Sequence, residues 1–112
     1  MLNLNMIYDI MKLMNQNLKD IFKTLKENEK KIKDFKVREL SIFGSFARGE
    51  NTNMSDLDFL VEFDKASFDS YMDLKFFLED LFHTKVDLVV KKNLKERLRL
   101  IILREAVRVP GL

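Results

Sequence analysis

The sequence predicts an α+β (mixed α/β) fold, a small mixed β-sheet with helices packed on one face. Three short runs rich in β-branched and aromatic residues are expected to form strands: residues 37–43, 57–63 and 86–90. Longer stretches with apolar residues at helical spacing flank and separate these runs: residues 3–34, 68–82 and 93–106. Strands that alternate with helices in this way are typical of one sheet covered by helices.

Turn and capping residues support the boundaries of these elements. The first strand runs directly into a Gly-Ser sequence, which predicts a short helical turn before the second strand. Ser67 is a suitable N-cap for the helix that follows it, because its side-chain oxygen can accept a hydrogen bond from the first turn. Asn93 is expected to cap the last helix, with Glu96 three positions later as in a capping box.

The N-terminal stretch carries an apolar seam with alternating spacings of three and four residues: Leu4, Ile7, Met11, Met14, Leu18, Ile21 and Leu25. Asn28 ends the seam. For residues 18–35 we expect an amphipathic helix packed on its own sheet. Residues 1–16 are expected to form a helical extension. Its residues 4–14 have little domain left to cover, so we expect the extension to contact a partner or, in a homo-oligomer, a second copy of the chain.

Length and composition fit one domain over residues 1–112. The formal net charge of +2 is too small to argue for nucleic acid as a partner. The chain has no cysteine, which excludes disulfides and thiolate metal sites. No stretch has the length of a membrane span, and the N-terminus lacks a basic region followed by an apolar run. We therefore expect a cytoplasmic protein.

The Gly-Ser turn has the residues that a phosphate-binding loop needs. Gly44 permits a close backbone approach, and Gly49 can adopt the positive φ that ends a short helical turn. Ser45 can offer its hydroxyl and nearby backbone N–H groups to phosphate oxygens. Arg48 lies one turn further on and carries a permanent positive charge suited to phosphate. These four residues are the candidate nucleotide ligands.

Three aspartates on strands are the candidate catalytic and metal-binding residues. Asp56 and Asp58 are two positions apart, so their side chains are expected to project from the same face. Asp87 lies on the polar face of the third predicted strand. If the two strands are neighbours, the three carboxylates converge, and a hard divalent cation would relieve their repulsion. With phosphate oxygens they could bind two Mg²⁺ ions, as an in-line displacement requires.

These motifs resemble the polymerase-β-like nucleotidyltransferase superfamily. The sequence Phe43-Gly44-Ser45-Phe46-Ala47-Arg48-Gly49, followed by Ser55-Asp56-Leu57-Asp58 and the later Asp87, is similar to minimal nucleotidyltransferases (MNT proteins) over about residues 18–109. The resemblance implies a nucleotidyltransferase fold and an antitoxin of the MNT/HEPN toxin–antitoxin type. It also implies transfer of AMP from MgATP to a hydroxyl, that of a tyrosine, in a partner HEPN ribonuclease toxin.

Two alternative functions stay open at this point. The chain would inhibit a toxin by binding alone if its site were vestigial, or it would modify a small molecule such as an aminoglycoside. The single histidine, His83, has no local partner in the sequence that would orient it for catalysis. We interpret it as a residue at a helix end. A basic cluster near the C-terminus is usually a solvated helix face, with contact to RNA or an acidic partner as the minority interpretation: Lys91, Lys92, Lys95, Arg97, Arg99, Arg104 and Arg108.

Overall fold

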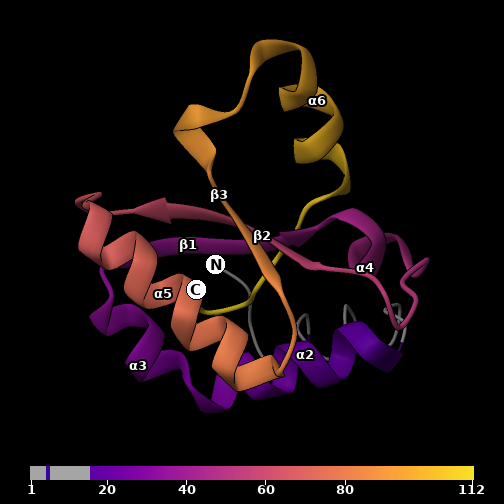
Figure 1. Cartoon of the computed structure of the whole chain (residues 1–112), viewed down its shortest axis with the longest axis horizontal. Helices are drawn as coiled ribbons and strands as arrows, with labels where there is room; N and C mark the ends of the chain where they lie inside the picture. The colour runs from indigo at the N-terminus through magenta and orange to yellow at the C-terminus, as the bar shows by residue number, and fades with distance from the viewer. Residues whose placement is uncertain (1–4, 6–15) are drawn as a thin grey trace.

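The computed structural model of the protein describes residue 5 and residues 16–112 (Figure 1). Its elements, in chain order, are α2 (Gln16–Glu27), α3 (Glu29–Asp34), β1 (Val37–Phe43), α4 (Gly44–Arg48), β2 (Leu57–Phe63), α5 (Phe68–Phe82), β3 (Val86–Val90), the 3₁₀ turn η1 (Lys91–Asn93), α6 (Glu96–Glu105) and β4 (Val107–Arg108).

The strands form one mixed sheet in the order β3-β2-β1-β4. β1 pairs antiparallel with both β2 and β4, whereas β2 and β3 run parallel and are connected through α5. The mixed sheet predicted from the sequence is confirmed, with one strand more than expected. β4 has two residues, which is too short to show the alternation by which a strand is recognised in a sequence.

One face of the sheet carries the main hydrophobic core. Leu57, Phe59 and Val61 of β2 are buried there, and Val86 and Leu88 of β3 lie beside them in register. Helices α2, α3 and α5 lie on this side of the sheet (Figure 1). They contribute buried apolar residues to the same core: Leu18, Ile21, Phe22, Leu25, Ile32, Leu74 and Leu78. Burial of this apolar surface is the main favourable contribution to folding.

The opposite face of the sheet carries acidic residues on β2 and β3, together with the buried Leu60 of β2. Asp58 and Glu62 of β2 and Asp87 of β3 alternate with the buried residues of the core face. α6 lies on this polar side, apart from the other three long helices (Figure 1), and has no buried residue. The predicted packing of helices on one face therefore holds for α2, α3 and α5, while α6 borders the polar face.

Most of the predicted boundaries are confirmed. β1, β2, α5 and β3 have the predicted ranges. Ser67 is the N-cap of α5, and its Oγ accepts a hydrogen bond of 3.1 Å from the N–H of Ser70. His83 ends α5 as an exposed C-cap residue in the left-handed conformation (φ 52°), in agreement with its interpretation as a helix-end residue.

The predicted start of the last helix is wrong. Asn93 belongs to η1, and no capping box forms with Glu96. The reason is the backbone between them: Leu94 and Lys95 have ψ values of 130° and 138°, so the chain is extended until α6 begins at Glu96. The later start leaves Lys95 outside the helix as its N-cap residue, and Lys91 and Lys92 lie in η1 at the end of β3.

Only the second part of the N-terminal apolar seam lies within the described residues. Leu18, Ile21 and Leu25 are buried in the core, so the predicted packing of this part on its own sheet is confirmed. The seam positions before them lie outside the described residues: Leu4, Ile7, Met11 and Met14. The role of the N-terminal extension in association stays a prediction. Within residues 16–112, no helix is long and apolar enough to cross a lipid bilayer.

Candidate functional site

The Gly-Ser turn is the short helix α4, which begins at the end of β1. Gly44 is buried and has φ 74°, and a Cβ atom added there would collide with Oδ2 of Asp58. Gly49 is the C-cap of α4 with φ 71°, which confirms the left-handed conformation predicted for it. Both glycines are therefore required by the backbone. The close approach permitted by Gly44 brings the turn against a carboxylate of the adjacent strand.

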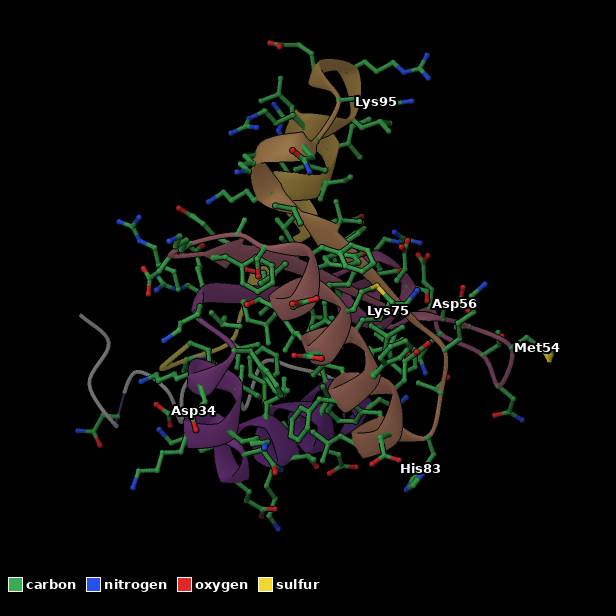
Figure 2. The ribbon with its side chains drawn as sticks, turned by 60° about the vertical axis from the view of Figure 1, so that its left-hand side comes forward. Asp34, Met54, Asp56, Lys75, His83 and Lys95 are labelled. Atoms are coloured by element: carbon green, nitrogen blue, oxygen red, sulfur yellow. The ribbon has the colours of Figure 1, made fainter. Side chains whose placement is uncertain are left out.

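The loop between α4 and β2 is held by its own side chains. The hydroxyl of Ser55 accepts a hydrogen bond of 2.8 Å from the N–H of Thr52, and Oγ1 of Thr52 accepts one of 3.2 Å from the N–H of Met54. Met54 lies at the exposed tip of this loop, and Asp56 lies at its return to the sheet (Figure 2). Ser55 thus has a structural role in delivering Asp56 to the start of β2.

The parallel pairing of β2 and β3 brings two of the three aspartates together. Asp58 and Asp87 are direct partners in the register of these strands. Neighbouring strands are about 4.8 Å apart, and paired residues point to the same face. Asp56 precedes β2 by one residue, and its carboxylate lies 3.9 Å from the ammonium group of Lys85. The predicted neighbourhood of the two strands is thus observed, and it places the aspartates beside the glycine turn.

Glu105 is a further member of this site that the sequence analysis missed. It is the last residue of α6, and its carboxylate accepts hydrogen bonds of 2.9 Å from the N–H of Gly44 and from the Nη1 of Arg48. The side chain thereby connects α6 to both ends of the glycine turn. Gly44 and Glu105 are 61 positions apart in the chain, and no motif or spacing links them. Only the folded chain identifies this contact.

Arg48 already has acidic partners in this structure. Its Nε lies 3.0 Å from Glu50, and its Nη1 lies 2.9 Å from Glu105. These carboxylates, Glu50 first, raise the pKa of the guanidinium further. Arg48, which was predicted to bind phosphate, therefore forms ion pairs that connect the glycine turn to Glu50 and Glu105. An incoming phosphate would have to share or displace these carboxylates.

Asp58 is the electrostatic centre of the site. Burial raises the pKa of its carboxyl group from the ordinary value of 3.8 to about 6. The negative charges of Asp87, Asp56 and Glu105 act in the same direction, and the positive charge of Arg48 acts against them. The repulsion expected between the carboxylates is therefore present, and a cation placed among them would relieve it.

The donor set suits a hard divalent cation. Asp56, Asp58 and Asp87 offer only carboxylate oxygens, which Mg²⁺ prefers. Over the part of the chain that the structure describes, no three acidic or histidine side chains are already arranged as a metal site. His83 lies at the far end of α5, well away from Asp56 (Figure 2), so it has no place in this site. Metal binding by the aspartates stays a proposal.

The raised pKa of Asp58 predicts a pH-dependent effect of Asp58→Asn. The folded protein retains a proton that the unfolded chain releases between about pH 4 and pH 6, so folding stability falls as pH rises through this window. Removing the charge should stabilise the metal-free protein near pH 7.5 by about 1–2 kcal/mol, a value reduced for solvent screening. Near pH 3 the gain should disappear, because this pH lies below both the ordinary pKa of 3.8 and the raised value, so Asp58 is mostly protonated in both states.

Urea unfolding of both proteins at the two pH values measures this effect. Asp80→Asn, on the exposed surface of α5, reports the general effect of removing one negative charge. The prediction is wrong if Asp58→Asn is no more stabilising than Asp80→Asn near pH 7.5.

The contacts of Glu105 predict that Glu105→Ala destabilises the fold. The change leaves the N–H of Gly44 and one arm of Arg48 without their acceptor, which should lower the free energy of unfolding by about 1–3 kcal/mol. Glu50→Ala is the matched control, because it removes the other carboxylate of Arg48 at a more exposed position and should cost about 0.5 kcal/mol or less. Denaturant unfolding of both variants tests this; equal costs would mean that Glu105 does not hold the turn.

Similarity to known proteins agrees with this geometry. Protein adenylyltransferase MntA of Thermococcus cleftensis is 39% identical over 94 residues, which cover 82% of this chain and 95% of the relative. A structure provisionally named a minimal nucleotidyltransferase is 35% identical with a TM-score of 0.64, and the match covers 77% of this chain and 93% of that one.

A more distant structure shares the fold alone. It is the complex of a tri-AMPylated HEPN toxin with an MNT antitoxin from Shewanella oneidensis, with 20% identity, a TM-score of 0.53 and coverage of 78% of this chain and 72% of that one. The model of the nucleotidyltransferase domain family matches residues 18–109, which include the glycine turn, the three aspartates and Glu105. The chain therefore belongs to the nucleotidyltransferase domain family.

Proposed function

We propose that this protein transfers AMP from MgATP to a hydroxyl group of a partner protein. The observation that carries the proposal is the in-register pair Asp58 and Asp87 beside the Gly44 turn, which puts carboxylates for a cation next to backbone suited to phosphate. The similarity to protein adenylyltransferase MntA supports AMP as the transferred group and a protein as the acceptor.

The aspartates would hold the metal and the turn would hold the phosphates. Asp56, Asp58 and Asp87 would bind two Mg²⁺ ions, which neutralise charge on the triphosphate when bound. Gly44, Ser45, Arg48 and Gly49 would cradle the β- and γ-phosphates. Ser45 is half-buried in α4, directly after the Gly44 backbone. Arg48 would contribute by exchanging one of its carboxylate partners for a phosphate oxygen, since both are hydrogen-bond acceptors of the same charge sign.

The reaction is a displacement at the α-phosphorus of ATP. The acceptor oxygen forms a bond to this phosphorus, the bond to the bridging oxygen of the β-phosphate breaks, and pyrophosphate leaves. Asp87 is exposed on β3 beside Asp58, where it would help to take up the proton of the acceptor hydroxyl. Catalysis then rests on positioning and charge neutralisation, without a covalent intermediate on the protein.

The partner would be a HEPN toxin, modified on a tyrosine. The S. oneidensis complex, in which an MNT antitoxin accompanies an AMPylated HEPN toxin, supports this choice, as does the relation to MntA. AMP on a tyrosine adds bulk and negative charge, which would repel RNA from a nearby ribonuclease site. The protein would then act as an enzymatic antitoxin.

The double substitution Asp56→Asn with Asp58→Asn should abolish metal-dependent nucleotide binding. Calorimetry with MgATP is expected to show binding to the natural protein and a loss of about 100-fold or more in affinity for the variant, because two of three carboxylates are lost. Asp64→Asn with Asp80→Asn removes two exposed aspartates outside the site and serves as the matched control. Equal affinity of the natural protein and the site variant would remove these residues from the metal site.

Incubation of the partner toxin with this protein and MgATP should increase the mass of the toxin by whole AMP units. Mass spectrometry of the intact toxin measures the change, and Asp56→Asn should prevent it by weakening the metal site. Omission of Mg²⁺ is the matched control. A toxin that is inhibited in a stoichiometric complex without a gain of mass would instead establish inhibition by binding alone.

A further inference from the structure

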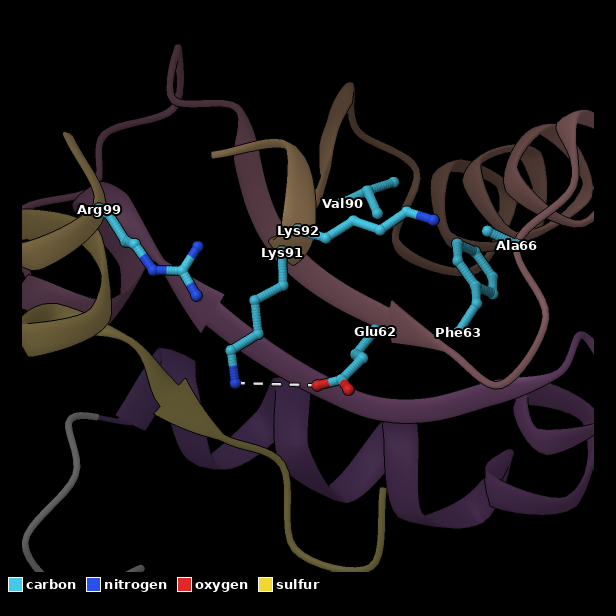
Figure 3. A pocket seen from close by; sticks show the side chains of 7 residues that line it. All are labelled: Glu62, Phe63, Ala66, Val90, Lys91, Lys92 and Arg99. Carbon is cyan, nitrogen blue, oxygen red and sulfur yellow. Dashed lines mark ion pairs between the residues drawn. The ribbon is translucent and has the colours of Figure 1, made fainter. Parts of the chain in front are cut away.

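A cationic pocket lies on the polar side of the sheet, between the ends of β2 and β3 and helix α6. It has a volume of about 360 Å³ and seven lining residues (Figure 3): Glu62, Phe63, Ala66, Val90, Lys91, Lys92 and Arg99. The cations approach from different elements, since Lys91 and Lys92 come from η1 and Arg99 comes from α6. None of these residues is assigned to the aspartate site.

The charges of this cationic pocket are only partly balanced. Lys91 is shared between Glu39 and Glu62, at 3.7 Å and 3.8 Å. Lys92 and Arg99 have no ion-pair partner within residues 16–112. Two unpaired cations in one concave site attract an anionic group, and the arginine fork suits a carboxylate.

One wall of the cationic pocket is apolar. Phe63, Ala66 and Val90 line it, and the same three residues also line a neighbouring hollow of about 560 Å³. That hollow continues to Phe68, whose side chain is 77% exposed, and to Tyr71. The ligand that fits both parts has an acidic group next to an apolar one, as a peptide segment does.

The pocket is aligned with the reactive centre. Glu62 lies four positions after Asp58 on the same face of β2. At about 3.3 Å per residue, the two positions are about 13 Å apart along the strand. Leu60 lies between them on this face and is buried, so a bound segment would pass outside the side chains that cover it. About four extended residues would span the distance from the pocket to the aspartates.

We propose that the cationic pocket docks an acidic residue of the segment that carries the acceptor hydroxyl, about four residues from that hydroxyl. The inference rests on the proposed function for its protein acceptor and adds the site that selects it. Arg99 and the ammonium group of Lys92 lie on opposite sides of Lys91 (Figure 3), so a single acidic side chain would contact one of these unpaired cations. An RNA strand would instead bring successive phosphates over Glu62, Asp58 and Asp87, which repel them.

Two labelled peptides test this docking. Each peptide has one tyrosine and, four residues away, an acidic residue next to an apolar one. This pair precedes the tyrosine in one peptide and follows it in the other. Two control peptides have lysine in place of the acidic residue. Fluorescence anisotropy should show that at least one acidic peptide binds about tenfold more tightly than its lysine counterpart. Lys92→Glu with Arg99→Glu should remove this preference.

Lys95→Glu with Arg97→Glu is the matched control. It changes the net charge equally, at exposed residues that line neither hollow, and Lys95 lies at the outer end of α6 (Figure 2). This variant should keep the preference for the acidic peptide. Loss of the preference in both variants would attribute it to overall charge and overturn the proposal, as would equal binding of acidic and lysine peptides.

Two further measurements separate the pocket from the other sites. MgATP calorimetry on Lys92→Glu with Arg99→Glu should give unchanged affinity; a loss would assign the pocket to the nucleotide and overturn the docking proposal. A short single-stranded RNA that binds more tightly than the acidic peptide, with the same dependence on Lys92 and Arg99, would overturn it also. Docking of the peptide without AMP transfer to the toxin would contradict the proposed function alone.

Discussion

The alternation of β2 is the constraint on which the rest of this structure depends. Its residues Leu57, Phe59 and Val61 must enter the core, so Asp58 and Glu62 must face the other way. Parallel pairing with β3 then brings Asp87 beside Asp58. The same hydrophobic burial that stabilises the sheet therefore forces like charges together. Burial of Asp58 is the largest cause that raises its pKa to about 6, and the neighbouring charges of Asp87 and Asp56 add to it.

The glycine turn adds a second constraint on the same carboxylate. Gly44 leaves no room for a side chain against Asp58, and Glu105 satisfies its N–H from the opposite side of the turn. Within the described part of the chain, the negative charges of Asp87, Asp56 and Glu105 act on Asp58, and the positive charge of Arg48 partly offsets them. Such a site is costly without a cation and becomes favourable with one. A cation bound among these carboxylates, as in the proposed function, would relieve this repulsion.

Helix α6 borders the polar face of the sheet and contributes residues at both of its ends. It has no buried residue, and Leu98, Leu100 and Ile101 on it are exposed. Its C-terminal residue contacts the glycine turn, and its Arg99 lines the cationic pocket. The helix therefore contributes to both ends of the polar face, which extends from the glycine turn to the proposed docking site for the acceptor.

The sequence alone determined the three longer strands, the glycine turn and the placement of the aspartates on the strand face opposite the apolar residues. These features depend on the alternation of residues along a strand and on the backbone conformations that glycine can adopt. Val37–Phe43, Leu57–Phe63 and Val86–Val90 were predicted with the observed bounds. The prediction from the sequence placed the start of α6 too early, because Asn93 is a suitable cap residue but the backbone after it is extended. Only the tertiary structure revealed Glu105 and β4. Glu105 contacts Gly44 and Arg48, and β4 pairs with β1, so in both cases the partners lie far away in the chain. Contacts of this kind leave no periodic pattern in a single sequence.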